Sequence, residues 1–177
     1  MKMNNYMRKS VLVLLLLLSS LVASAQLVIP GTGVTFSLKQ NEWLYMRTLE
    51  MDGGAEMYLY CYTGKVVVDQ VGDTVLPFLR IYVNSDYAGD VYELAYERYM
   101  QQPFQSVKEY TQGIGLPRSG GLGYEGAYTN PTDQKDYRFM MTYFKDRGAA
   151  VEFRLETTKD TYDDMLPVFK SVMSSLK

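Results

Sequence analysis

The 177-residue chain contains no histidine and a single cysteine, Cys61. Without histidine it has no Ser-His-acid triad, no histidine to activate a cysteine nucleophile, and no His-containing zinc or copper site. One cysteine excludes an intramolecular disulfide even in an oxidising compartment. Because Cys61 alternates with Met57 and Leu59, we interpret it as a small buried hydrophobe in a strand. We expect neither a cofactor nor a metal.

Positive charge is also scarce. Removal of an N-terminal signal of 25 residues leaves 15 basic and 20 acidic residues, a formal charge of −5. Nucleic-acid binding depends on basic patches, and attraction to anionic lipid depends on polybasic segments. The composition therefore argues against a nucleic-acid partner and against an electrostatic membrane anchor.

The one long hydrophobic run, residues 11–18, lies near the N-terminus. Basic residues precede it and small residues follow it: Lys2, Arg8, Lys9 and Ala23-Ser24-Ala25. This order predicts a signal peptide of residues 1–25, cleaved between Ala25 and Gln26. The run is shorter than the about 20 residues of a membrane span, and no cysteine follows the cleavage site for acylation. We expect a periplasmic or secreted protein without stable membrane insertion, with an uncleaved anchor as the alternative.

The last third of the chain has the clearest pattern. Alternation predicts strands at 137–144 and 149–156, joined by a turn at Asp146-Arg147-Gly148. In the second strand Glu152, Arg154 and Glu156 alternate with apolar residues, so we expect them on a solvent-exposed face.

A closing helix follows this predicted hairpin. Apolar residues from Tyr162 to Leu176 recur every three or four positions, and Phe169 lies in the middle of the stripe. We expect Phe169 to be buried against the hairpin, and Asp160 or Thr158 to cap the helix. Pro167 predicts a late helix start near Asp163 or a bend.

The middle of the chain reads as strands and one helix. The predicted strands are 34–38, 43–50, 56–62, 65–69, 78–83, 104–110 and 124–129. The predicted helix covers 91–102, with Asp90 and Glu93 as a capping box and Pro103 at its end. We therefore expect a single α+β domain over residues 26–177.

Three segments resemble the PsbP-like family, whose fold is shared with the Ran-binding Mog protein and the envelope protein DcrB. They are Phe36-Ser37-Leu38 with Trp43, Gly123-Tyr124-Glu125-Gly126, and the ending with Tyr162, Leu166-Pro167, Phe169 and Ser175-Leu176. The resemblance implies an α/β/α sandwich with a central, mainly antiparallel sheet, and an accessory or binding role. The chain departs from the family by lacking a proline before Trp43 and by an enlarged 51–76 region. No binding residue of the family has a match to carry over.

Several small groups of polar residues are weak site candidates. Asp86 with Asp90, and Asp133 with Asp136, lack the spacing of a calcium loop, so we interpret them as turn and cap residues. The glycine-rich 113–123 segment has no phosphate-loop motif. Acid–base catalysis is a minor alternative for three acids that flank a predicted hairpin turn: Glu50, Asp52 and Glu56.

Tyrosine is abundant, with 16 in the whole chain. A two-residue turn within 52–55 would place one aromatic strip on a single face of the 43–50/56–62 hairpin. That candidate interaction surface consists of Trp43, Tyr45, Arg47, Tyr58, Tyr60 and Tyr62. The opposite face would carry a core set of Leu44, Met46, Met57, Leu59 and Cys61. Tyrosine is also an ordinary strand residue, so cover by a helix is the alternative.

Two classes of function follow. The first is an exported, non-catalytic binding or accessory module of the cell envelope that contacts a protein, with a small ligand as the alternative partner. The second is an envelope hydrolase that uses carboxylates. The absence of histidine and of a well-spaced acid pair favours the binding module.

Overall fold

The computed structural model describes residues 24–109 and 121–177. In chain order its strands are β1 (Ser24–Val28), β2 (Thr35–Lys39), β3 (Trp43–Glu50), β4 (Glu56–Tyr62), β5 (Val67–Val68), β6 (Thr74–Val75), β7 (Phe78–Asn84), β8 (Phe104–Glu109), β9 (Leu122–Thr129), β10 (Asp136–Asp146) and β11 (Ala149–Thr158). The α-helices are α2 (Val91–Met100) and α3 (Tyr162–Met173), and a short 3-10 turn, η1, covers Asp52–Gly54.

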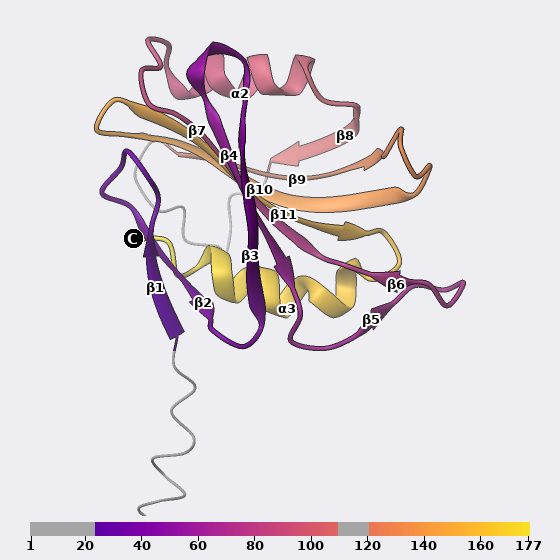
Figure 1. Cartoon of the computed structure of the whole chain (residues 1–177). Coiled ribbons are helices and arrows are strands. Elements are labelled where there is room, and N and C mark those ends of the chain that lie inside the picture. The colour runs from indigo at the N-terminus through magenta and orange to yellow at the C-terminus, as the bar shows by residue number, and fades with distance from the viewer. Residues whose placement is uncertain (1–23, 110–120) are drawn as a thin grey trace, which may run out of the picture.

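Seven strands form one antiparallel sheet in the order β3-β4-β7-β11-β10-β9-β8. Helix α2 packs on one face and α3 on the other, as Figure 1 shows above and below the sheet. The expected α/β/α sandwich with a central antiparallel sheet is confirmed. Two small hairpins, β1–β2 and β5–β6, lie outside the main sheet.

The β10–β11 hairpin turns on Arg147 and Gly148, which have φ of 52° and 88°. Two consecutive positive φ values match a tight turn whose twist suits the flanking strands, and glycine adopts such a value without strain. The turn that the sequence predicts at this point is confirmed.

Helix α3 covers the apolar face of the sheet. It begins at Tyr162 and continues through Pro167. Neither predicted cap is present: Thr161 is the N-cap, and the Asp160 carboxylate accepts the backbone N–H of Gln70. Phe169 is fully buried, as expected.

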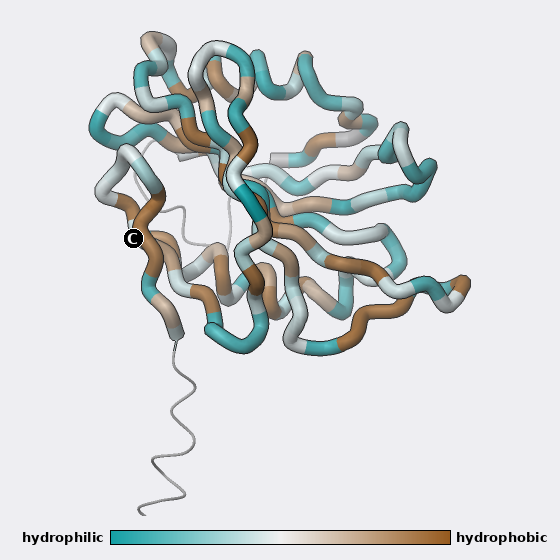
Figure 2. The backbone as a smooth tube through the Cα atoms, viewed as in Figure 1, coloured by the Kyte–Doolittle hydropathy of each residue, from teal (hydrophilic) through white to brown (hydrophobic). Residues whose placement is uncertain are grey.

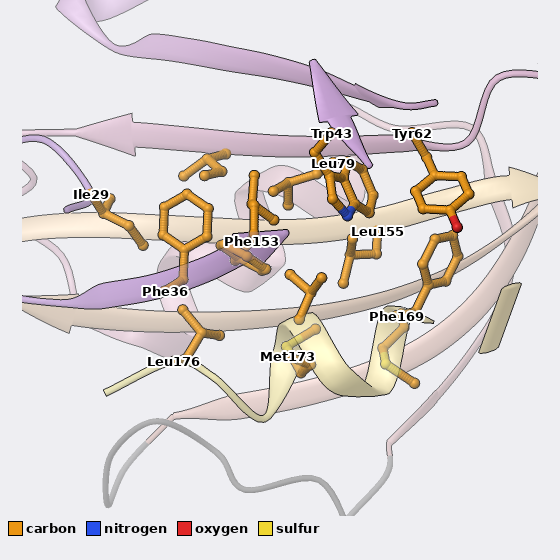
Figure 3. Packing of buried hydrophobic residues seen from close by; sticks show 14 of the residues in the cluster. Ile29, Phe36, Trp43, Tyr62, Leu79, Phe153, Leu155, Phe169, Met173 and Leu176 are labelled. Atoms are coloured by element: carbon orange, nitrogen blue, oxygen red, sulfur yellow. The ribbon is translucent and has the colours of Figure 1, made fainter. Parts of the chain in front are cut away.

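The main core lies between α3, β2 and the sheet. Figure 3 shows Phe169, Met173 and Leu176 facing Phe153 and Leu155 of β11. The brown tube segments of Figure 2 mark the hydrophobic strands that meet at this core. This side of the molecule is held together by apolar burial, which contributes about 25 cal/mol for each Å² removed from water.

Strand β1 is not predicted by the sequence pattern. It pairs with β2, placing Ala25 opposite Leu38 and Gln26 opposite Ser37. The expected cleavage site therefore lies inside strand β1 of the uncleaved chain. After cleavage, residues Gln26 to Val28 would still be available to pair with β2.

Candidate functional site: a tyrosine groove above a buried ion cluster

The β3–β4 hairpin differs from its expected geometry in the length of its turn and in a bulge within β3. Glu50 pairs with Glu56, so the turn contains one residue more than the expected two-residue turn. The extra residue changes which residues of β3 and β4 share a face. A bulge between Tyr45 and Arg47 then restores the expected facing for Trp43 and Tyr45, which pair with Tyr62 and Tyr60. Arg47 consequently pairs with Leu59 and not with the aromatic strip, so its placement on that surface is wrong.

The aromatic residues of the predicted surface do share a face. Trp43 and Tyr62 are buried in the core beneath α3, and Tyr58 and Tyr60 pack against that core while partly buried. Only Tyr45 is half exposed, at 50%. On the opposite face Met57, Leu59 and Cys61 are buried, whereas Leu44 and Met46 are exposed, so the expected core set is wrong for these two.

The weaker candidates remain scattered. Glu50 and Glu56 lie opposite each other at the end of the hairpin, where Glu56 accepts a hydrogen bond from Tyr58. Asp90 caps α2 with Glu93 in the predicted capping box. Asp133 accepts hydrogen bonds from the Lys135 backbone and the Tyr137 hydroxyl. Most of the 113–123 segment lies outside the described residues, and within 24–109 and 121–177 no three His, Cys, Asp or Glu side chains gather as a metal site.

The charged side of β11 is buried, which corrects the expected solvent-exposed face. The exposed fractions of Glu152, Arg154 and Glu156 are only 1%, 3% and 0%. The alternation predicted the strand correctly, but α2 covers this face. Burying these three charged groups is costly unless each is paired and hydrogen-bonded.

Glu152 is the carboxylate of this charged face that contacts α2. It accepts a hydrogen bond from Arg98 Nε of α2 at 3.0 Å and from the Tyr143 hydroxyl at 3.1 Å, and Arg154 Nε lies 3.6 Å away. Burial alone would raise the pKa of Glu152, but the Arg154 and Arg98 guanidiniums hold that pKa below its usual range. Glu152 is therefore a fixed anion that ties α2 to the sheet.

Glu156 is held by two guanidiniums, one of which, Arg154, also lies beside Glu152. Arg80 Nε lies 2.5 Å from one carboxylate oxygen and Arg154 Nε lies 3.2 Å from the other. The C-terminal end of α2 adds Gln102, which accepts a hydrogen bond from Arg154, and Gln101, which accepts one from Arg98. Three arginines thus surround two glutamates under the helix.

A groove of about 380 Å³ opens beside this cluster, between α2 and strands β8 to β10. Five of its nine lining residues are tyrosines and none is charged: Tyr92, Ala95, Tyr96, Tyr99, Val107, Leu122, Tyr124, Met141 and Tyr143. Its volume is in the range of small-molecule sites. We call this feature the tyrosine groove.

One tyrosine joins the groove to the ion cluster. Tyr143 is 1% exposed, packs edge-on against Tyr124 with ring centroids 6.0 Å apart, and donates its hydroxyl to Glu152. Burial and the Glu152 charge raise the pKa of Tyr143 far above its ordinary value. The floor of the groove is therefore a neutral phenol in a fixed orientation.

The outer wall of the groove is helix α2, which exposes an unusual number of large aromatic side chains. Tyr92 and Tyr96 are each 66% exposed and Tyr99 is 46% exposed, while the buried residues of α2 are Leu94 and Arg98. Figure 2 colours parts of α2 as hydrophilic, because the helix also contains Glu93, Glu97 and Arg98. The sequence signal was the i, i+4, i+7 spacing of three tyrosines on a predicted helix, which by itself is more typical of a core-facing stripe.

Comparison with known proteins gives similarity of structure only. No family model and no curated protein matches the chain. The cyanobacterial PsbP protein of Synechocystis sp. PCC 6803 is similar, with a TM-score of 0.47 and 13% identity, over 89% of this chain and 94% of that one. PA94 of Pseudomonas aeruginosa, of unknown function, has a TM-score of 0.46 and 10% identity over 87% and 96%. LpqN of Mycobacterium tuberculosis, involved in cell envelope biogenesis, has a TM-score of 0.41 and 12% identity over 90% and 92%.

Proposed function

We propose that this chain is an exported, non-catalytic binding module of the cell envelope that contacts a protein partner through the tyrosine groove. The observation that carries the proposal is the exposure of Tyr92, Tyr96 and Tyr99 along one uncharged groove. Tyrosine is among the residues that dominate binding energy at interfaces, because its large rigid ring loses little entropy on contact.

The surroundings of the groove support a binding role. Its floor is fixed by the Tyr143–Glu152 hydrogen bond, and its helical wall is fixed by the Arg98–Glu152 ion pair. A site whose side chains are already held in place loses less entropy when a partner binds.

Among residues 24–109 and 121–177, the carboxylates give the hydrolase alternative less support. A general acid needs a carboxyl whose pKa is raised, within reach of a substrate. Glu152 and Glu156 are instead buried against arginines, and Glu50 and Glu56 lie at an exposed hairpin end that lines no groove described above.

Export of the chain rests on its N-terminal pattern of basic residues, apolar run and Ala-Ser-Ala motif. Within residues 24–109 and 121–177, neither helix is long and apolar enough to cross a membrane. N-terminal sequencing of protein from its own host should show Gln26 as the first residue, and recovery of an N-terminus that still carries residues 1–25 would contradict this.

The binding proposal is tested by affinity capture with the mature chain on a support. An envelope extract is passed over the wild type, over Tyr92→Ala/Tyr96→Ala, and over Tyr45→Ala as a matched control. Tyr45 is another half-exposed tyrosine, but it lies on β3 and away from the groove. We expect a captured protein that is lost with the groove variant and kept with the control. Equal recovery on all three supports would overturn the proposal.

A further inference from the structure

Cleavage after Ala25, as proposed above, makes Gln26 the first residue of the mature chain. A glutamine in that position carries two groups that react with each other, a free α-amine and a side-chain carboxamide. Attack of the amine on the side-chain carbonyl carbon closes a five-membered ring. The reaction requires that the folded chain leaves both groups free to meet.

The backbone of Gln26 points away from the neighbouring strand. Gln26 lies opposite Ser37 of β2, but the Ser37 N–H donates to Ser175 Oγ at 2.8 Å and not to β1. Opposite residues of an antiparallel pair either exchange both of their backbone hydrogen bonds or make none with each other. Gln26 and Ser37 therefore form a pair without hydrogen bonds, and pairing with β2 does not occupy the α-amine that cleavage creates.

The side chain of Gln26 is accessible as well. The residue is exposed, and its Nε2 donates to Thr35 Oγ1 at 3.0 Å on the surface of the protein. An exposed hydrogen bond between neutral groups contributes little, because water replaces either partner. Rotation of the side chain therefore frees the carboxamide to approach the amine of its own residue.

The residues that follow keep the terminus at a fixed place on the surface. Ile29 is fully buried and its N–H donates to the Val34 carbonyl at 2.9 Å, while Leu27 packs against the main core. Removal of the signal thus leaves a short strand that is anchored by Leu27 and Ile29 and ends in one exposed residue. The new terminus is presented to solvent and is not drawn into the core.

We infer that Gln26 of the mature chain is a modification site and is converted to pyroglutamate. The α-nitrogen forms a bond to Cδ, the bond between Cδ and Nε2 breaks, and Nε2 leaves as ammonia with the proton that the amine gives up. The reaction needs no oxidant and no second substrate. The lactam carries no charge, whereas a terminal ammonium is positive, so the mature chain loses one positive charge and the free amine that aminopeptidases recognise.

The test is mass spectrometry of the chain isolated from the envelope of its own host. We expect an intact mass one ammonia below that of residues 26–177, and a tandem spectrum of the N-terminal peptide that places the loss on residue 26. A lactam blocks stepwise chemical sequencing, so the first residue is read from this spectrum. Gln26→Met is the matched control, because it keeps the length of the side chain but has no carboxamide, and its N-terminal peptide should keep its full mass.

This inference rests on the proposed cleavage after Ala25, and the same spectrum separates the two. A wild-type chain that begins at residue 26 and keeps its ammonia would overturn the inference and leave the cleavage standing. Loss of ammonia from the N-terminal peptide of Gln26→Met would also overturn it, since the loss would then come from another residue. A chain that still carries residues 1–25, or begins at any other residue, would overturn both.

Discussion

Both faces of the central sheet bury apolar residues, but the α2 face adds a buried ion cluster, and β11 shows the contrast within one strand. Val151, Phe153 and Leu155 point into the apolar core under α3, whereas Glu152 and Arg154 lie among charges under α2. Figure 1 shows a helix over each face. A fully buried strand can therefore alternate between apolar and charged residues, and the alternation identifies the faces without telling which one meets water.

The two faces also differ in what they contribute. Apolar burial stabilises in proportion to area and tolerates conservative exchange. A buried ion cluster gains little net stability, since desolvation offsets the attraction, but it is sensitive to loss of any one member. The α3 face thus has the larger apolar core, and the ion cluster of the α2 face fixes the positions of α2 and of the groove beside it.

The largest effect is expected on the apolar face. Phe169→Ala removes a fully buried ring and should lower the free energy of unfolding by about 3–5 kcal/mol. Denaturant melts of the mature chain measure this loss. Ser174→Ala, at the exposed C-cap of the same helix, is the control and should change stability by no more than about 0.5 kcal/mol. Equal, small losses for the two variants would show that the face is misassigned.

A comparable loss is expected when the ion cluster loses its central cation. Arg154→Met leaves Glu152 without one guanidinium and Glu156 with only the partly exposed Arg80, and breaking a buried pair costs about 3–5 kcal/mol. The matched variant Arg154→Met/Glu156→Leu removes both charges of one pair and should recover part of the loss. A single variant as stable as the wild type would mean that the cluster is hydrated.

Removal of the cation of the helix should have a smaller effect. Arg98→Met deletes the ion pair from α2, but Glu152 keeps Arg154 and the Tyr143 hydroxyl, so we expect a loss of about 1.5–3 kcal/mol. Relative to the wild type, hydrogen exchange of Arg98→Met should speed up more for the amides of α2 than for those of α3. Equal protection of the two helices would show that Arg98 does not hold α2.

Acid should weaken the α2 face through Glu152. Its pKa is held below the usual 4.5 in the folded state, so its contribution to stability is present above that value and is lost as pH falls through the folded pKa. Glu152→Gln should therefore have a flatter stability profile below pH 4.5 than the wild type in denaturant melts. Parallel profiles would contradict an ionised Glu152.

Much of the framework was predictable because its signals are local. Strand alternation around Asp146-Arg147-Gly148, the capping box of Asp90 and the apolar stripe of α3 depend on residues a few positions apart. The bulge at Met46 and the burial of Glu152 depend on what pairs with or covers each strand, and local sequence does not contain that information. The tyrosine groove belongs to the second kind, because α2, β9 and β10 must come together before it exists.

The smallest expected effect on stability separates function from folding on the α2 face. Tyr96→Ala removes a ring that is already 66% exposed, and alanine is the better helix former, so stability should change by no more than about 0.5 kcal/mol. The same variant should recover less of the envelope protein that the wild type captures, whereas Phe169→Ala should unfold at a lower denaturant concentration and, where still folded, capture that protein normally. Denaturant midpoints and affinity capture with both variants, measured on the same protein samples, make the comparison. A loss above about 2 kcal/mol for Tyr96→Ala would show that its ring packs as part of the core, and would remove Tyr96 from the binding surface.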